Sequence, residues 1–471
     1  MTHMPAKKLL GTFTLSMISI SAIISLRNFP TMATQGYSSV VFYLLATLLF
    51  FIPTALVTAE LGSAWPGKGG IYHWVAQAFG SKTGGVAVWL EWIEGIVWLP
   101  PALSFVAAAL AYVIAPLFPN TLPLTENRLY LVTAMLFMLW TTTFINRFGI
   151  KISSLISSLG VILGSIIPGL LIMGLGGYWL YSGRPTHLVF EPQNLIPDFS
   201  FDTLVFSTSV LLSFAGIEIA AYHMPDTERP HRTFPRATFI SAFLIFCLYV
   251  FGALSIAIVI PKEDINLFAG VMQAFSYFLD AFHMARWVPV IAGMILLGAL
   301  ALLNTWILGP SKGLLVSAEA GNLPHIFARV NRFGAPSALL LSQAILGSLL
   351  TLVFLFMPTV NSSYWILNVL TSQLILLMYM ALFVSAIWLR IIQPNTPRHY
   401  KIPGGLFGMV CVGSIGFLAS LGTFCLGFVP PPHLDMGAKE FYIGFLAIGL
   451  VMLSLPPFIW YWFNGRRRES L

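Results

Sequence analysis

Long apolar segments follow one another along almost the whole chain, and they constrain its fold more than any other feature. Each is close to 20 residues or longer, which is enough to cross a hydrocarbon core about 30 Å thick as a helix. They lie near residues 9–34, 38–61, 84–115, 129–146, 151–181, 203–224, 237–260, 286–318, 337–357, 364–392, 406–429 and 441–463. Only 9% of the 471 residues are charged, against about 25% in soluble domains. The sequence therefore predicts an all-α polytopic membrane protein with twelve transmembrane helices.

The basic residues predict the orientation of these spans. If both termini are cytoplasmic, 18 of the 24 Lys and Arg residues fall in cytoplasmic loops and tails, five fall in outside loops, and Arg27 lies within the first span. Cytoplasmic loops of membrane proteins carry an excess of Lys and Arg, so this asymmetry predicts cytoplasmic N and C termini. The net charge of +7 is thereby explained by topology, and we expect membrane lipid and no nucleic acid among the partners.

Two of the segments carry polar residues at membrane depth. The first contains Ser16, Ser19, Ser21 and Ser25, and the sixth contains Ser207, Ser209, Ser213, Gly216 and Glu218. A charged residue at the centre of a span costs about 2.5–3.5 kcal/mol, so we interpret Glu218 as functional. Spans 1 and 6 run in opposite directions, and interruptions at matching positions of two inverted halves indicate a substrate site near the midplane. The alternative is that small residues only let the helices pack closely.

The predicted repeat divides the chain into three parts within one integral membrane domain. Residues 1–181 form the first inverted repeat of five spans, and residues 182–392 form the second. Residues 393–471 hold two further spans and a short cytoplasmic tail.

The sequence gives no sign of a cofactor, a metal site or catalytic machinery. Its three Cys lie in apolar runs without a CxxC pair, which indicates packing and neither a disulfide framework nor a metal site. No GxxxxGK[ST] loop is present for ATP hydrolysis. A membrane-embedded enzyme would need a constellation such as HExxH, whereas the nine His sit mainly in loops or near interfaces. We therefore expect no enzyme, no cofactor and no metal.

Several motifs resemble those of the amino acid, polyamine and organocation transporter superfamily. They are AELGSAWPGKGGIYHWV at 59–75, FAGIEIAAYHMPDTERPHRTFPRA at 214–237 and LGPSKGLLVSAEAGNLPHIFARVNRFGAP at 308–336. Within the superfamily, ALSIAIVIPKEDINLFAGVMQAF at 253–275 and KIPGG at 401–405 resemble the bacterial glutamate/gamma-aminobutyrate antiporter family. The resemblance covers nearly the whole chain. One departure is Arg229, which stands where Asn is usual.

The resemblance implies a LeuT-type fold, in which spans 1 and 6 are broken and spans 11 and 12 are extra helices. It places the main-chain substrate contacts at Ser21, Ala22, Ile23 and Ile24 in span 1 and at Ser213, Phe214, Ala215, Gly216 and Ile217 in span 6. Main-chain N–H groups of span 1 would meet an amino acid's carboxylate, and carbonyls near span 6 would meet its ammonium group.

Four side chains are candidates for further roles at this site. Glu218 is the candidate for proton coupling, because burial favours the neutral form of a carboxyl group, with a structural acid as the alternative. Trp98 and Trp306 match substrate-contacting or gating aromatic positions of the superfamily, and Phe214 lies beside the break of span 6. Phe214 and Trp306 are the candidate gates, with packing or an interface anchor as the alternative for each aromatic residue.

Span 3 contains two acids, Glu91 and Glu94, which share one helix face. Only Glu94 is deep enough to approach the site, and its alternative role is to pair with a polar group of another helix. Extra acids disfavour an anionic substrate. Arg27 lies about 27 Å along a continuous span 1, so we expect it to snorkel to the outer interface or to attract carboxylates there.

The function that we expect is secondary active transport of a small-molecule amino acid by alternating access, in the inner (plasma) membrane of a bacterium. An amino acid antiporter, with or without protons, is favoured. Proton-coupled uptake of a zwitterionic or cationic amino acid is the alternative, and a transporter-like sensor or channel is a different class. The short tail after span 12 does not support gating by a cytoplasmic plug, and a homodimer is left open.

Overall fold

The computed structural model describes residues 10–65, 69–117, 124–147, 160, 162–188, 196–218, 227–432 and 434–469. Ten helical segments in these ranges are long and apolar enough to cross a membrane. They are Gly36–Ala64, Ser81–Leu117, Arg128–Asn146, Ile162–Tyr181, Arg232–Val259, Ala285–Glu319, Ser337–Phe356, Val360–Ile392, Gly405–Leu426 and Lys439–Phe463. Each corresponds to one of the predicted spans. The protein is an all-helical, multi-pass membrane protein, and the total of twelve spans stays a prediction.

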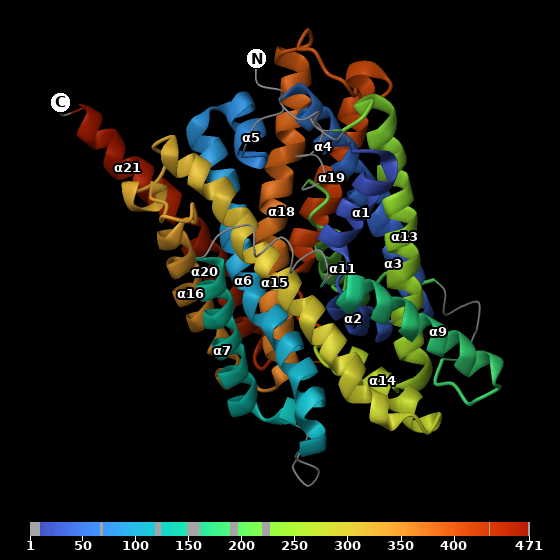
Figure 1. The fold of residues 1–471 in the computed structure, drawn as a ribbon. Helices are drawn as coiled ribbons and strands as arrows, with labels where there is room; N and C mark the ends of the chain where they lie inside the picture. Colours follow the sequence, from blue (N-terminus) through green and yellow to red (C-terminus); the bar gives the residue numbers. More distant parts are fainter. Residues whose placement is uncertain are drawn as a thin grey trace, which may run out of the picture.

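The helices form one bundle of long, tilted elements (Figure 1). Those of the first half are α1 (Thr12–Ile23), α2 (Phe29–Ala33), α3 (Ser39–Ala46), α4 (Ile52–Ala64), α5 (Ile71–Phe79), α6 (Ser81–Ile114), α7 (Arg128–Asn146) and α9 (Ile167–Tyr181). The later ones are α10 (Phe201–Leu204), α11 (Ser207–Ser213), α13 (Pro230–Val259), α14 (Gly270–Ala281), α15 (Val288–Glu319), α16 (Ser337–Thr351), α17 (Val353–Phe356), α18 (Val360–Ile392), α19 (Gly405–Leu426), α20 (Lys439–Ser454) and α21 (Pro456–Glu469).

The two remaining predicted spans, 1 and 6, are the ones that consist of short pieces. In span 1, α1 ends at Ile23, and a short 3₁₀ turn (η1, Leu26–Asn28) leads into α2. In span 6, α10 and α11 are followed by a turn in which Gly216 has a φ of +113°. Only glycine adopts such a conformation without strain, so Gly216 makes this interruption feasible. Residues 219–226 lie outside the described residues.

The interruption of span 1 lies at the C-terminal end of the stretch that the sequence suggested. Ser21 to Ile23 remain in the last turn of α1, and the N–H of Ile24 still donates to the carbonyl of Ile20 at 2.8 Å. Extended backbone begins at Ile24, with φ −67° and ψ 121°, and continues at Ser25, with φ −137° and ψ 122°. β-Branched residues such as isoleucine readily adopt extended backbone, so the helix can end here without glycine.

Burial within the bundle distinguishes central helices from peripheral ones. In the segment that contains α6, 83% of the most apolar stretch of 18 residues is buried, whereas only 17% of the corresponding stretch is buried in Lys439–Phe463. The helices α15 and α18 pack along α6, and α13 packs along α1 (Figure 1). A polar group on the buried face of α6 therefore has protein and not lipid around it, and so the residues of α6 can build a polar site.

One helix crossing depends on glycine. Gly164, in a π-helical turn (η6, Ile162–Ile166), faces Gly298 of α15. A Cβ atom added to Gly298 would lie 2.4 Å from the Cα atom of Gly164, closer than any real contact. Close backbone approach at small residues is a common way in which membrane helices associate. This crossing holds η6 against α15, one of the helices that line the site described below.

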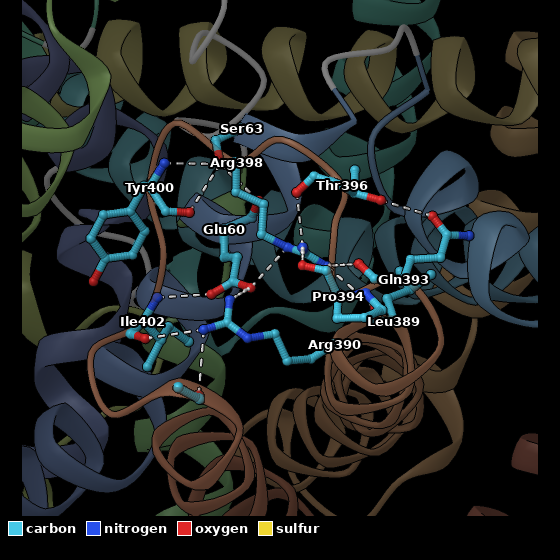
Figure 2. A network of polar contacts seen from close by, with 11 residues as sticks. Glu60, Ser63, Leu389, Arg390, Gln393, Pro394, Thr396, Arg398, Tyr400 and Ile402 are labelled. Atoms are coloured by element: carbon cyan, nitrogen blue, oxygen red, sulfur yellow. Dashed lines mark hydrogen bonds and ion pairs between the residues drawn. The ribbon is translucent and has the colours of Figure 1, made fainter.

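A buried ionic network ties three elements together at the upper end of the bundle (Figures 1 and 2). Glu60 of α4 is 1% exposed and pairs with Arg390 at the end of α18. Arg398, in the connection to α19, has its Nε atom 3.1 Å from Oε1 of Glu60, without hydrogen-bond geometry. The N–H of Ile402 donates to Oε2 of Glu60 at 2.8 Å. One carboxylate thus fixes the α18–α19 connection against α4.

Candidate functional site

A tyrosine of α13 joins the two interruptions. The hydroxyl of Tyr249 lies 2.8 Å from the carbonyl oxygen of Ile23 in span 1 and 2.9 Å from that of Ser213 in span 6. It has one proton and donates to one carbonyl at a time, while Nδ2 of Asn28 donates to it at 3.3 Å. Backbone groups released at membrane depth need such partners. Tyr249 therefore shows that the two breaks lie side by side.

A second tyrosine, from α18, holds the turn of span 6. The N–H of Gly216 donates to the hydroxyl of Tyr379 at 3.0 Å, and this hydroxyl donates to Oε2 of Glu218 at 2.7 Å. Glu218 is 2% exposed. The same hydroxyl group therefore contacts both the backbone of the turn and the acid.

A small cavity lies between the two interruptions. It is lined by Ile23, Ser25, Arg27, Asn28, Glu94, Trp98, Leu212, Ser213, Ala215, Leu302 and Trp306. Its volume is about 30 Å³, which is room for about two water molecules. The site is thus nearly closed in this structure, and it must widen to take a molecule the size of an amino acid.

An arginine of span 1 and a glutamate of α6 line this cavity. Arg27 and Glu94 are each 3% exposed. The guanidinium Nη1 of Arg27 donates to Oδ1 of Asn368 in α18 at 2.9 Å. Within the described part of the chain, Nε of Arg27 and Oε2 of Glu94 have no hydrogen-bond partner. Each charged group therefore keeps one buried polar atom that is available to a ligand.

The expected position of Arg27 at the outer interface is wrong. The depth of Arg27 was counted along a continuous helix, whereas the helix ends at Ile23 and extended backbone follows from Ile24. The side chain of Arg27 is therefore buried within the protein. The guanidinium lies over the ring of Trp98, 5.2 Å from its centroid, and over that of Tyr364, at 5.8 Å. Trp98 in turn packs on Trp306, with centroids 5.8 Å apart. Cation and rings thus form one stack along the cavity wall.

Three acids gather on one side of the site. They are Glu91, Glu94 and Glu218, and all three are buried. The carboxyl group of each interacts electrostatically with that of at least one of the others. Only Glu94 of the α6 pair lines the cavity. No group of three or more His, Cys, Asp or Glu residues among the described residues has a geometry that could hold a metal ion.

The residues singled out from the sequence separate into cavity-lining and packed positions. Those that line the cavity are Ile23, Glu94, Trp98, Ser213, Ala215 and Trp306. Ile24 and Ile217 are buried beside it, and the side chains of Ser21 and Ala22 lie outside the described part of the structure.

Phe214 belongs to the packed group. It is fully buried and packs against the rings of Tyr43, Phe51 and Tyr249, with centroids 6.2, 5.4 and 5.5 Å away. It is not among the residues that line the cavity. Its role as a gate stays a prediction.

Sequence reasoning missed Tyr249 and Tyr379. A tyrosine in an apolar span resembles an ordinary packing residue, and the only available signal is its polar hydroxyl at membrane depth, which needs a partner. Fifteen tyrosines share that signal. The structure identifies these two by their hydroxyl groups, because that of Tyr249 reaches carbonyls of both interruptions and that of Tyr379 reaches the turn of span 6 and Glu218.

The arrangement of the helices matches that of a solved structure. The structure of MhsT in complex with L-phenylalanine superposes with a TM-score of 0.58 over 90% of this chain and 100% of that one, at 16% sequence identity. The chain thus has a LeuT-type transporter fold with interrupted helices 1 and 6. Fold and site together define a multi-pass membrane protein of the LeuT type.

Sequence comparisons narrow this class. The model of the family described as amino acid permease matches residues 10–453. An uncharacterized transporter of Legionella pneumophila is 40% identical over 455 residues, 96% of this chain and 97% of that one. A glutamate/gamma-aminobutyrate antiporter of Lactococcus lactis is 31% identical over 466 residues, 98% of this chain and 92% of that one. The chain belongs to the amino acid permease family, within the amino acid, polyamine and organocation superfamily.

Proposed function

We propose that the protein is a secondary active amino acid antiporter that works by alternating access. The observation that carries this proposal is that both interrupted spans line one small cavity that also contains ionisable and polar side chains. A site at the junction of two inverted repeats, 1–181 and 182–392, is opened to one side at a time when one part of the bundle moves against the other. The antiporter relative at 31% identity supports exchange over one-way uptake.

The substrate would be held chiefly by the main chain. In the proposed arrangement, N–H groups at the interruption of span 1 bind the carboxylate of the amino acid. Carbonyl groups of span 6, including that of Ser213, bind its ammonium group. Tyr249 occupies the carbonyls of Ile23 and Ser213 in the closed state. Arrival of an ammonium group would release its hydroxyl, which couples binding to a change at both breaks.

Exchange is tested by counterflow in proteoliposomes. Vesicles that contain the purified protein are loaded with unlabelled glutamate, gamma-aminobutyrate, glutamine or ornithine, and uptake of labelled amino acid is followed. We expect at least one internal amino acid to accelerate uptake over empty vesicles. Uptake that needs only a proton gradient would favour the alternative, a proton-coupled uptake permease, which the acids Glu91 and Glu94 would suit if the cargo were zwitterionic or cationic. An uncoupled current or no flux would contradict both and favour a channel or a sensor.

Glu218 is the residue that we propose for proton coupling. Its carboxylate accepts a hydrogen bond from the hydroxyl of Tyr379, which also accepts from the N–H of Gly216. Protonation of Glu218 would therefore change the partner that holds the turn of span 6. In Glu218→Gln, which mimics the protonated acid, we expect exchange whose rate no longer changes between pH 5 and 8. A pH profile like that of the wild-type protein would leave Glu218 a structural acid.

The proposed orientation places the N and C termini in the cytoplasm of a bacterial cell. Arg390, Arg398 and Lys401 then lie on the cytoplasmic side, as the excess of basic residues in cytoplasmic loops predicts. Protease accessibility of the C-terminal tail in right-side-out and inverted vesicles tests this orientation.

A further inference from the structure

The buried atoms without partners at the cavity are a donor and an acceptor. Nε of Arg27 is a donor, and Oε2 of Glu94 is an acceptor, and neither has a hydrogen-bond partner among the described residues. Both side chains are 97% buried and line the same cavity. Leaving a buried polar atom unsatisfied is costly, particularly when the group is charged, so this pair is prepared for something that supplies both partners.

Arg27 is fixed in place without such a partner. Asn368 accepts a hydrogen bond from its Nη1, and the rings of Trp98 and Tyr364 lie against its guanidinium. The hydroxyl of Tyr364 also donates to the main-chain carbonyl of Arg27 at 3.2 Å. Helix α18 therefore holds the guanidinium from two sides. A fixed donor recognises a ligand atom better than a flexible one, because no entropy is lost in ordering it.

We propose that Arg27 and Glu94 determine the specificity for the substrate side chain and select one that is uncharged and carries both an acceptor and a donor. A primary amide, as in glutamine, has this chemistry, since its oxygen accepts from Arg27 and its NH₂ group donates to Glu94. This inference rests on the proposed function, in which the main chain of spans 1 and 6 takes the carboxylate and ammonium groups common to all amino acids.

The charges explain why selection favours a neutral side chain. In the proposed arrangement Glu94 is ionised, and its charge and that of Arg27 offset one another across the cavity. A side-chain carboxylate would bring a second negative charge beside Glu94, and a side-chain ammonium would bring a second positive charge beside Arg27. Charges interact strongly in a poorly solvated site, so either mismatch weakens binding. Removing one charge of the pair should therefore redirect the preference in a direction that can be stated in advance.

Binding to the purified full-length protein in detergent tests the proposal. The probes are glutamine, glutamate and ornithine, which differ in side-chain charge, and affinity is measured from ligand-dependent thermal shifts. The wild-type protein is expected to prefer glutamine. Glu94→Gln should shift the ratio of affinities toward glutamate by about tenfold or more, and Arg27→Gln should shift it toward ornithine by a similar factor. Arg27→Lys retains the charge and should retain the order.

Matched controls remove the same charges elsewhere. Glu319→Gln removes an exposed carboxylate at the end of α15, which does not line the cavity. Arg184→Gln removes a guanidinium that lies over the rings of Trp179 and Phe282, outside the cavity. Neither control should change the order of the three ligands. Unfolding curves without ligand establish that every variant is folded.

Several outcomes would overturn the proposal. A wild-type protein that binds glutamate or ornithine more tightly than glutamine, or that binds none of the three, contradicts it. If Glu94→Gln has the same order of affinities as the wild-type protein, the proposal is also contradicted, because the charge of Glu94 would then not affect ligand binding. Equal weakening of all ligands by both variants would indicate a structural role only. If glutamine binds as expected but no counterflow occurs, the antiport proposal fails and the selection by Arg27 and Glu94 stands. If counterflow occurs without a preference for glutamine, the antiport proposal stands and the selection fails.

Discussion

Single hydroxyl groups maintain the two interruptions of this bundle. The hydroxyl of Tyr249 lies within hydrogen-bonding distance of a carbonyl of each broken span, and that of Tyr379 accepts from the N–H of Gly216 and donates to Glu218. Broken helices at membrane depth are stable only where protein or water supplies such partners. These residues therefore explain how the chain tolerates the irregular backbone that the site requires.

Replacing Tyr249 by Phe should destabilise the protein and slow exchange. The variant leaves two buried carbonyls and Asn28 without the hydroxyl, a loss of about 1–3 kcal/mol in the free energy of unfolding. Thermal unfolding in detergent and counterflow measure the two effects. Tyr442→Phe is the control, because its buried hydroxyl also donates to a carbonyl, that of Gly427, but far from the cavity. Equal exchange rates in the two variants would contradict the role of Tyr249.

Site residues could be predicted from the sequence where their burial in a membrane span costs free energy. Glu218 and Glu94 stand out as acids in apolar spans, and the structure buries both. Arg27 was misplaced because its depth was counted along a helix that is in fact interrupted three residues earlier. The two tyrosines give no comparable signal, since a phenol ring is compatible with packing anywhere in an apolar span.

At the level of elements, close glycine contacts set how the helices cross. Gly298 of α15 meets Gly164 of η6 backbone to backbone. In Gly298→Ala the new methyl group must push η6 and α15 apart, and we expect destabilisation by about 1–3 kcal/mol. Gly293→Ala on the same helix is the control, because its Cβ would meet nothing within 4 Å. Thermal unfolding distinguishes them, and similar midpoints would show that the crossing tolerates a side chain.

The network around Glu60 joins α4, the end of α18 and the connection to α19. Glu60→Gln leaves the guanidinium groups of Arg390 and Arg398 without their carboxylate, and loss of one partner from a buried ion pair typically costs about 3–5 kcal/mol. We expect a lower unfolding midpoint and faster amide hydrogen exchange in residues 393–404. The exposed Glu263→Gln serves as the control. Unchanged exchange in residues 393–404 would show that the network does not hold this connection.

The ends of the continuous spans could be predicted from the sequence, because the thickness of the membrane sets the length of an apolar helix. The apolar run near 364–392 is found as Val360–Ile392, and that near 337–357 as Ser337–Phe356, because a span must hide its backbone in a helix. The pieces of spans 1 and 6 were less predictable. Their ends depend on local partners, such as the positive φ of Gly216, and not on average hydropathy.

For the molecule as a whole, we propose that substrate binds between the two interruptions. The nearly closed cavity beside Ser25 and Ser213 is the place where it would bind. The cavity must open on one side and then on the other, so each residue of its lining should become reachable from solution during the cycle. Substrate should protect such a residue while it is bound.

The most direct test is substrate protection of a cysteine at position 25. Ser25→Cys is made in a background in which Cys247, Cys411 and Cys425 are replaced, and its modification by a membrane-impermeant thiol reagent is timed in proteoliposomes, with and without glutamine or glutamate. A cysteine at the exposed Ser182 is the control. We expect that modification at position 25 abolishes exchange and is slowed by the amino acid, and that the amino acid does not change the rate of modification at position 182. Modification of position 25 at the same rate with and without either amino acid would contradict it.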